Sequence, residues 1–292
     1  EFVDIAGLVK GASQGEGLGN QFLHNIREVD AIIQVVRCFD DENTIHVAGK
    51  VDPISVIEIV NTELALADLA SVERRIQRIQ KQAKGGDKEA VLENNALLKL
   101  QELLGEGKFI NLDEHFNADE IAVIKQLNLM SVKPVIYCAN ISDDNISTPE
   151  DEIEYVKNVK EFAKRENAKC VMVCAKFEEE LCSLSDEEAE LFKAELGLEE
   201  TGLNKLIVAG YDLLGLISYL TAGEKEVRAW TITKGTKAPK AAGKIHTDFE
   251  RGFIKAEVVS YADIVEAGNF VKAKEKGKVR LEGKEYVVQD GD

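Results

Sequence analysis

The sequence predicts an α/β protein in which a parallel sheet carries helices on both faces, with a helical insertion and a small second domain of mainly β type. Three observations predict this fold class. Val- and Ile-rich runs that are nearly continuous, as strands buried on both faces are, alternate with amphipathic helical segments. A long stretch of helical apolar spacing separates the first run from the second. Short strand-like runs punctuated by glycines begin near Arg228.

Composition and charge exclude several classes of protein. The 292 residues suffice for two or three domains with separate cores. The net charge of −17 argues against a surface that wraps nucleic acid broadly, so no DNA partner is expected, although a local basic patch could bind RNA. No apolar run approaches the ~20 residues of a transmembrane helix, so no membrane partner is expected. The five cysteines lack zinc-like spacing, which is typical of reduced thiols in a cytoplasmic protein.

The chain opens with an apolar run that ends in Asp4-Ile5-Ala6-Gly7, and a glycine-rich run follows. A carboxylate at the end of a buried strand can hold a Mg²⁺-bound water, and a glycine lets a main-chain N–H approach the γ-phosphate of a nucleotide. We expect these roles for Asp4 and Gly7. The plainer alternative is a flexible loop between a strand and a helix. The run that follows predicts a switch loop ordered by triphosphate, with glycines at Gly11, Gly15, Gly17 and Gly19.

A site of this kind also needs a loop that cradles the phosphates. The pattern G-x-x-x-x-G-K-[ST], which forms such a loop, occurs nowhere in the sequence. We therefore expect a nucleotide switch protein whose phosphate-binding segment lies upstream of Glu1. Without that segment, the 292-residue chain itself is expected to be a poor hydrolase.

A helix is predicted over 19–29, a strand over 31–36 and then a helical hairpin. Apolar residues recur at 3-4-3-4 spacing over 69–83, Gly85-Gly86-Asp87 interrupts the pattern, and leucines resume it over 97–104. Two such segments joined by a tight glycine turn predict an antiparallel helix pair. The outer positions are basic, which indicates either a solvated face or an arm that touches a large partner. These outer residues are Arg74, Arg75, Arg78, Lys81, Gln77 and Gln80.

Two further strands, over 132–139 and 169–175, flank a helix with Thr148 as its expected N-cap and Pro149 as its first residue. An Asn and an acid follow the first of these strands, and in open α/β sheets a nucleotide base is read at the carboxyl ends of the strands. An Asx turn is the alternative. The expected base-binding residues are Asn140, Ile141 and Asp143, with a weaker second loop of Cys174, Ala175 and Lys176.

The C-terminal region predicts a small domain of short strands at 230–233, 253–259 and 286–288. Between Arg228 and Lys255 there are seven Lys or Arg and two acids, a net charge of +5 on a strongly acidic chain. This reversal indicates either a surface for RNA or simply a solvated β-domain surface. The candidate contacts are Lys234, Lys237, Lys240, Lys244 and Arg251.

With these residues in place, the chain resembles the YchF/Obg-like ATPase family of P-loop proteins over essentially its whole length. The segments that carry the resemblance are 4–12, 17–20 and the basic tail 228–249. The resemblance implies a Ras-like nucleotide domain formed by 1–48 and 116–226, a helical coiled-coil insertion over 49–115, and a ubiquitin-like β-grasp domain of the TGS type over 227–292. It also implies Mg²⁺-dependent hydrolysis, usually of ATP in preference to GTP, and association with the ribosome.

Two positions depart from expected patterns. Leu8 occupies the position where Ras-like enzymes place the glutamine that orients the attacking water, so hydrolysis must rely on the metal, on other groups and on positioning, and slow turnover is expected. The family usually reads the base with N-x-x-E, and here Asp143 replaces the glutamate. In the common pattern N-K-x-D of other nucleotide-binding proteins, the aspartate hydrogen-bonds guanine. A preference for GTP over ATP therefore remains an alternative.

The sequence therefore predicts a cytoplasmic, monomeric nucleoside triphosphatase that uses Mg²⁺ and ATP or GTP. Its nucleotide state is expected to control binding to the ribosome, through the large subunit or its RNA. The alternative is a non-catalytic module that binds ribosomal RNA or protein through the basic tail.

Overall fold

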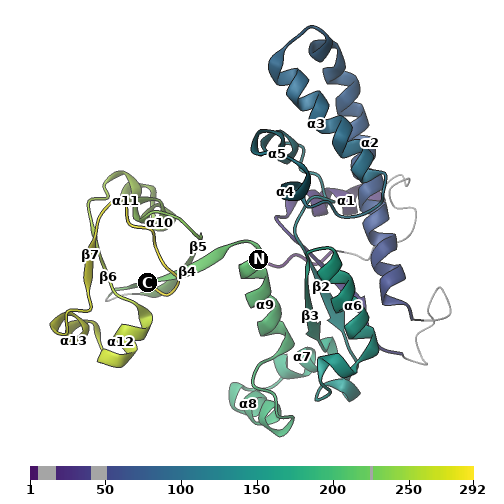
Figure 1. Cartoon of the computed structure of the whole chain (residues 1–292). Coiled ribbons are helices and arrows are strands. Elements are labelled where there is room, and N and C mark those ends of the chain that lie inside the picture. The colour runs from purple at the N-terminus through teal and green to yellow at the C-terminus, as the bar shows by residue number, and fades with distance from the viewer. Residues whose placement is uncertain (6–17, 41–50, 224–225) are drawn as a thin grey trace. The chain divides into compact units, whose positions relative to one another are not determined.

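The computed structural model describes residues 1–5, 18–40, 51–223 and 226–292, with the side chains of 18–22 left aside. The chain divides into two compact units, Glu1–Ala209 and Gly210–Asp292 (Figure 1). Each unit is described by itself below. Within the described residues, no helix is both long and apolar enough to cross a membrane.

The first unit is built on a three-stranded parallel sheet of order β1-β2-β3. Its strands are β1 (Ile32–Arg37), β2 (Val135–Asn140) and β3 (Lys169–Val173), so the three predicted strands and their parallel pairing are confirmed. A further strand expected to end at Asp4 is absent, since residues 1–5 carry no strand. Ile5 instead packs against the cluster that contains Leu23 and Ile26.

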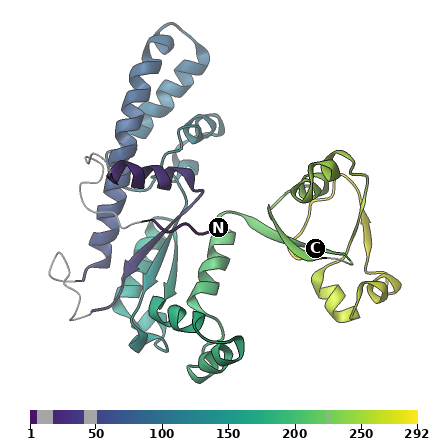
Figure 2. The ribbon, with the colours of Figure 1, turned by 180° about the vertical axis from the view of Figure 1, so that it is seen from behind.

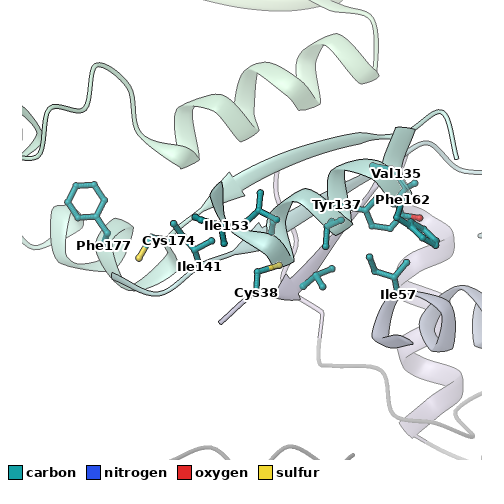
Figure 3. Packing of buried hydrophobic residues seen from close by; sticks show 14 residues of the cluster. Cys38, Ile57, Val135, Tyr137, Ile141, Ile153, Phe162, Cys174 and Phe177 are labelled. Atoms are coloured by element: carbon teal, nitrogen blue, oxygen red, sulfur yellow. The ribbon is translucent and has the colours of Figure 1, made fainter. Parts of the chain in front are cut away.

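One face of this sheet packs against α6 (Glu154–Arg165) and the start of α2 (Pro53–Lys84). Figure 3 shows Tyr137 and Phe162 in this core next to Ile57 of α2. The rings of Tyr137 and Phe162 meet edge to face with centroids 5.6 Å apart, a favourable arrangement for aromatic pairs. Ile153, Val156 and Ala163 face this core and are buried.

The start of this helix was predicted wrongly. Thr148 does not cap it; a 3₁₀ turn, η3 (Glu150–Glu152), comes first, and α6 begins at Glu154 with Ile153 as its N-cap. Ile153 is buried in the sheet core and has extended backbone angles, φ −89° and ψ 105°. Burial of this side chain in an extended conformation interrupts the helix that Thr148 and Pro149 would otherwise begin.

The helical hairpin consists of α2 (Pro53–Lys84) and α3 (Lys88–Leu104), which pack along each other. Both begin at an aspartate, Asp52 and Asp87, whose side chain accepts a main-chain N–H three residues on. Gly86 adopts φ +85°, a conformation that side chains disfavour, which explains the glycine in the tight connection. The predicted helix pair is thus present, and its inner positions form a core of Val72, Ile79, Leu97, Leu100 and Leu104.

Before β1, α1 (Leu18–Glu28) lies across α2 (Figure 2). It begins one residue before the predicted helix, so Gly19 lies in its first turn rather than in a loop. The remaining helices of the first part of the chain are α4 (Leu112–His115), α5 (Ala118–Lys125), η2 (Asp143–Asn145), α7 (Ala175–Cys182), α8 (Asp186–Glu195) and α9 (Gly202–Leu213).

The second unit contains two antiparallel strand pairs, β4 (Leu216–Ala222) with β5 (Val227–Thr233) and β6 (Ala256–Val258) with β7 (Arg280–Glu282). Two of the predicted strands fall in β5 and β6, whereas residues 286–288 contribute only a bridge from Val287 to Lys237. The pairing of β4 with β5 joins residues 216–222 to this unit, although 227 was expected to begin the domain. Its helices are α10 (Ala238–Ile245), α11 (Thr247–Arg251), α12 (Tyr261–Ala267) and α13 (Phe270–Glu275).

Candidate functional site

The carboxyl ends of β2 and β3 lie side by side, and Asn140 joins them. The Asn140 side-chain oxygen accepts a hydrogen bond of 3.0 Å from the main-chain N–H of Ala175, the first residue of α7. Its main-chain oxygen accepts from Cys38 at 2.8 Å, just beyond β1. One asparagine thus ties together the ends of all three strands. The two loops in which base-binding residues were predicted form one edge of the sheet.

An exposed ion pair connects the same two loops. Lys176 of α7 donates to the Asp143 carboxylate at the start of η2, and 62% and 46% of these side chains are exposed. The hydrogen bond from Lys176 lowers the pKa of the Asp143 carboxyl and raises the pKa of the Lys176 ammonium. At neutral pH this edge therefore presents a carboxylate acceptor beside an ammonium donor, both open to solvent.

Two of the predicted base-binding residues are buried. Ile141 is 3% exposed and packs in the sheet core with Cys174, which is 6% exposed (Figure 3). The Ile141 main-chain N–H donates to Val173 at 2.9 Å. Burial raises the pKa of the Cys174 thiol, so this group stays protonated. The exposed groups at this edge therefore belong to Asp143, Ala175 and Lys176, while Ile141 and Cys174 hold the two loops onto the core.

The predicted phosphate and metal region is described only in part. The Asp4 side chain is exposed, Gly19 lies in α1, and Gly7, Leu8, Gly11, Gly15 and Gly17 lie outside the described residues. No group of three or more His, Cys, Asp or Glu side chains that could hold a metal ion occurs in the described ranges. A single accessible carboxylate still fits Mg²⁺, which takes one or two protein carboxylates and completes its shell with water and nucleotide phosphates.

The basic residues of the second unit are all exposed but differ in their partners. Lys237 pairs with Glu285 and Lys240 pairs with Glu250, each at 2.5 Å. In the part of the chain that the structure describes, Lys234, Lys244 and Arg251 form no ion pair. Two of the five predicted RNA contacts are thus neutralised by acids within the same unit. Exposed pairs of this kind are weak, so an anionic partner could displace them.

The polar contact of Asn140 with Ala175 was not predicted, nor was a buried carboxylate at Asp68 of α2. Asp68 is fully buried and accepts hydrogen bonds from Ser131. The sequence carried a signal for it. Asp68 stands four residues after Leu64 and four before Val72, which are both buried, so it occupies the inner face of the helix. An acid at an inner position indicates a polar contact within the fold.

Comparisons with known proteins agree on one family. A family model described as YchF-GTPase_C, a protein of unknown function, matches residues 216–292. The chain is 56% identical over 292 residues to a Bacillus subtilis (strain 168) protein named "Ribosome-binding ATPase YchF", and 55% identical over 293 residues to the protein of that name from Escherichia coli O157:H7. Both alignments cover all of this chain and 79% of the relative.

Among solved structures, the chain is similar to the YchF GTPase of Schizosaccharomyces pombe with a TM-score of 0.84. The sequence identity is 39%, and the match covers 98% of this chain and 77% of that one. The α/β fold with a parallel sheet is therefore shared with a solved relative. At these identities over its whole length, the chain belongs to the YchF family.

Proposed function

We propose that the protein is a Mg²⁺-dependent P-loop nucleoside triphosphatase that acts as a ribosome-associated switch in the cytoplasm, as a monomer, and that prefers ATP to GTP. The observation that carries the proposal is the shared edge at the carboxyl ends of β2 and β3. There Asn140 locks the two loops together, and Asp143 and Lys176 stand exposed. The names of the bacterial relatives support both the nucleotide and the ribosome.

The proposed domains follow the family. The nucleotide-binding domain comprises 1–48 and 116–226, the helical hairpin lies in a coiled-coil insertion over 49–115, and a TGS domain of the β-grasp type follows from 227. The pairing of β4 with β5 and the match of the family model to 216–292 support moving the start of this last domain from 227 to 216, so that the nucleotide-binding domain ends at 215.

The proposed roles place the chemistry on three segments. Asp4 holds Mg²⁺ through a water and Gly7 offers its main-chain N–H to the γ-phosphate, while Leu8 gives no hydrogen bond to the attacking water. When bound, Mg²⁺ supplies the positive charge that offsets the phosphate oxygens. The glycine run that contains Gly11, Gly15 and Gly17 orders on the triphosphate. Asn140, Asp143 and Lys176 bind the base.

The ion pair at this edge favours adenine over guanine. The Watson–Crick edge of adenine presents one amino donor and one ring acceptor, which match one carboxylate and one ammonium. Guanine is read elsewhere by a carboxylate that accepts two N–H bonds, and Lys176 already occupies part of the Asp143 carboxylate. A site built around such hydrogen bonds discriminates strongly against the base that leaves them unpaired.

Titration of the full-length gene product with ATP and with GTP tests the proposal. We expect ATP to bind more tightly and Asp4→Ala to weaken both Mg²⁺-nucleotide binding and hydrolysis. Tighter binding of GTP by more than ~1 kcal/mol would show that Asp143 acts as a guanine reader, so that the protein is a GTPase. Unchanged turnover in Asp4→Ala would refute the metal role of this residue.

A non-catalytic module that binds ribosomal RNA or protein is the second candidate, favoured by Lys234, Lys244 and Arg251, which form no ion pair with any described residue. Phosphate contacts would make ribosome binding fall steeply with salt. Ribosome affinity measured by sedimentation with and without triphosphate separates the two. A switch requires the affinity to depend on the nucleotide, and a passive module requires that it does not.

A further inference from the structure

The helix that directly follows the glycine run rests on the base of the hairpin. Leu23 and Ile26 of α1 are each 6% exposed and pack on Leu64 and Ala67 of α2. A movement of α1, which begins at Leu18, therefore reaches α2 through this contact.

A polar network crosses the same interface. The Arg27 Nη2 atom of α1 lies 3.8 Å from Oδ1 of Asp68 and donates to the Ser71 hydroxyl at 3.1 Å. The other Asp68 oxygen accepts from the Ser131 N–H at 2.8 Å and from the Ser131 hydroxyl at 2.7 Å. Asp68 thus joins α1 and α2 to the segment that leads into β2.

The end of α1 is held from the same segment. Lys133 donates from Nζ to the main-chain oxygen of Arg27 at 3.0 Å and to that of Val29. Both carbonyls belong to the last turn of α1 or the residue after it, where main-chain oxygens have no partner within the helix. The Lys133 side chain is half-buried, and this desolvation lowers the pKa of its ammonium.

The network leaves two buried atoms without hydrogen bonds. Within the described residues, Asp68 Oδ1 and Arg27 Nε have no hydrogen-bond partner, although the two side chains face each other across the interface as a 3.8 Å ion pair. An open groove of about 600 Å³ lies beside them between α1 and α2, bounded by Leu23, His24 and Arg74 among others. A small shift of Arg27 toward Asp68 would satisfy both atoms, and the groove leaves α1 room to make it.

We propose that Arg27 and Asp68 form a two-position latch between α1 and the helical hairpin. In the relaxed position, seen here, Arg27 donates to Ser71 and only approaches Asp68. In the engaged position its guanidinium pairs directly with Asp68 Oδ1, and α1 draws the base of α2 with it. Triphosphate bound to the glycine run favours the engaged position, so this inference rests on the proposed function. The latch transmits the nucleotide state to the hairpin and needs no contact between the hairpin and the nucleotide.

Amide hydrogen exchange of the full-length gene product tests the latch, read over α1 and over residues 60–75 of α2. With a non-hydrolysable triphosphate and Mg²⁺, we expect exchange to slow about tenfold in both segments of the wild type. Asp68→Asn should keep the effect on α1 but lose it on α2. The matched control is Arg74→Gln, because Arg74 also donates to the Ser71 hydroxyl, at 3.3 Å, but lies on α2 itself. The control should respond like the wild type.

Failure of the latch and failure of the proposed function give different results. A full response of α2 in Asp68→Asn overturns the latch, and equal losses in Asp68→Asn and Arg74→Gln also overturn it. If the wild type binds no triphosphate, the proposed function fails, and a cycle of Arg27→Gln and Asp68→Asn in the nucleotide-free protein decides. Exchange effects on α1 that add independently then overturn the contact, whereas coupling of threefold or more supports it. If Asp68→Asn fails to fold, the same exchange measurement is made on Arg27→Lys, which keeps the positive charge.

Discussion

Two carboxylate–cation pairs in the first unit differ in almost every respect except their charges. Asp143 and Lys176 meet at the exposed edge of the sheet, with about half of each side chain in solvent. Asp68 is fully buried beneath Arg27, which is one third exposed. The exposed pair makes a direct hydrogen bond, whereas the buried pair stands 3.8 Å apart and its carboxylate relies on Ser131.

The difference shows what each pair can contribute. Water screens an exposed pair, so it adds little to stability but remains free to exchange partners with a ligand. A buried carboxylate carries a large desolvation cost that its hydrogen bonds must offset, so its loss is costly and its partner is hard to replace. Asp143 and Lys176 therefore suit recognition, and Asp68 suits the attachment of one element to another.

Replacement of the buried acid should have the largest effect. Asp68→Ala removes both hydrogen bonds to Ser131, leaves that hydroxyl and N–H unpaired, and strips Arg27 of its counter-ion. We expect the free energy of unfolding to fall by about 3 kcal/mol, the lower end for broken buried pairs because Arg27 is partly exposed. Urea denaturation measures it. Asp143→Ala should leave the urea denaturation midpoint unchanged. An equal loss of stability in both variants would contradict the proposed difference between the buried and the exposed pair.

The asparagine that locks the exposed edge should have an intermediate effect. Asn140→Ala loses the hydrogen bond to the Ala175 N–H, which joins two loops without a charge. We expect a loss of about 1 kcal/mol in the free energy of unfolding, together with weaker nucleotide binding. Asn145→Ala in η2 is the matched control, since among the described residues its side chain makes only a local bond of 3.4 Å to Ser142. A control as damaging as Asn140→Ala would show that the lock is unimportant.

How far the sequence predicted these sites depends on whether the signal is local. The end of β2 was predictable because a nearly continuous apolar run stops at Asn140, and the parallel sheet followed from the alternation of strands and helices. The hydrogen bond from Ala175 to Asn140 was not predictable, because it joins residues 35 positions apart and no local pattern encodes it. Thr148 shows the opposite failure. A strong local cap signal lost to the burial of Ile153 in the core.

The strand at 216–222 was missed for a related reason. It follows the apolar helix α9 after only a short turn, in which Gly215 adopts φ +60°, so helix and strand read as one apolar stretch. Only its pairing with β5 distinguishes it. For Asp68, the spacing from Leu64 and Val72 marked an inner position, but its partners Ser131 and Arg27 are distant in sequence.

The dependence of stability on pH should have opposite signs for the two acids. Burial raises the pKa of the Asp68 carboxyl, so between its ordinary value of 3.8 and its raised value the folded protein binds more protons than the unfolded chain. The stability contributed by Asp68 therefore falls as pH rises above 3.8. The hydrogen bond from Lys176 lowers the pKa of Asp143, so its contribution is present above 3.8 and is lost as pH falls below it.

Denaturation of wild type, Asp68→Asn and Asp143→Asn between about pH 3 and 7 measures both signs. As pH rises, the free energy of unfolding of the wild type should fall relative to that of Asp68→Asn. Between about pH 3 and 4, the free energy of unfolding of the wild type should rise relative to that of Asp143→Asn. Parallel curves for the two variants would contradict the assignment of one acid to a buried and one to an exposed environment.

The smallest effect on stability should accompany a clear effect on nucleotide choice. Lys176→Ala removes an exposed ammonium whose only described bond is to Asp143, so the denaturation midpoint should not move. The freed carboxylate can then accept two N–H bonds from guanine, and we expect the ratio of GTP to ATP affinity to rise by about tenfold, as measured by competitive titration of the full-length gene product. Lys274→Ala in the second unit is the matched control, because Lys274 forms a pair of similar exposure with Glu257, with 59% and 45% of the two side chains exposed. If the ratio is unchanged in Lys176→Ala, the exposed pair does not read the base, and recognition rests on Asn140 and the main chain alone.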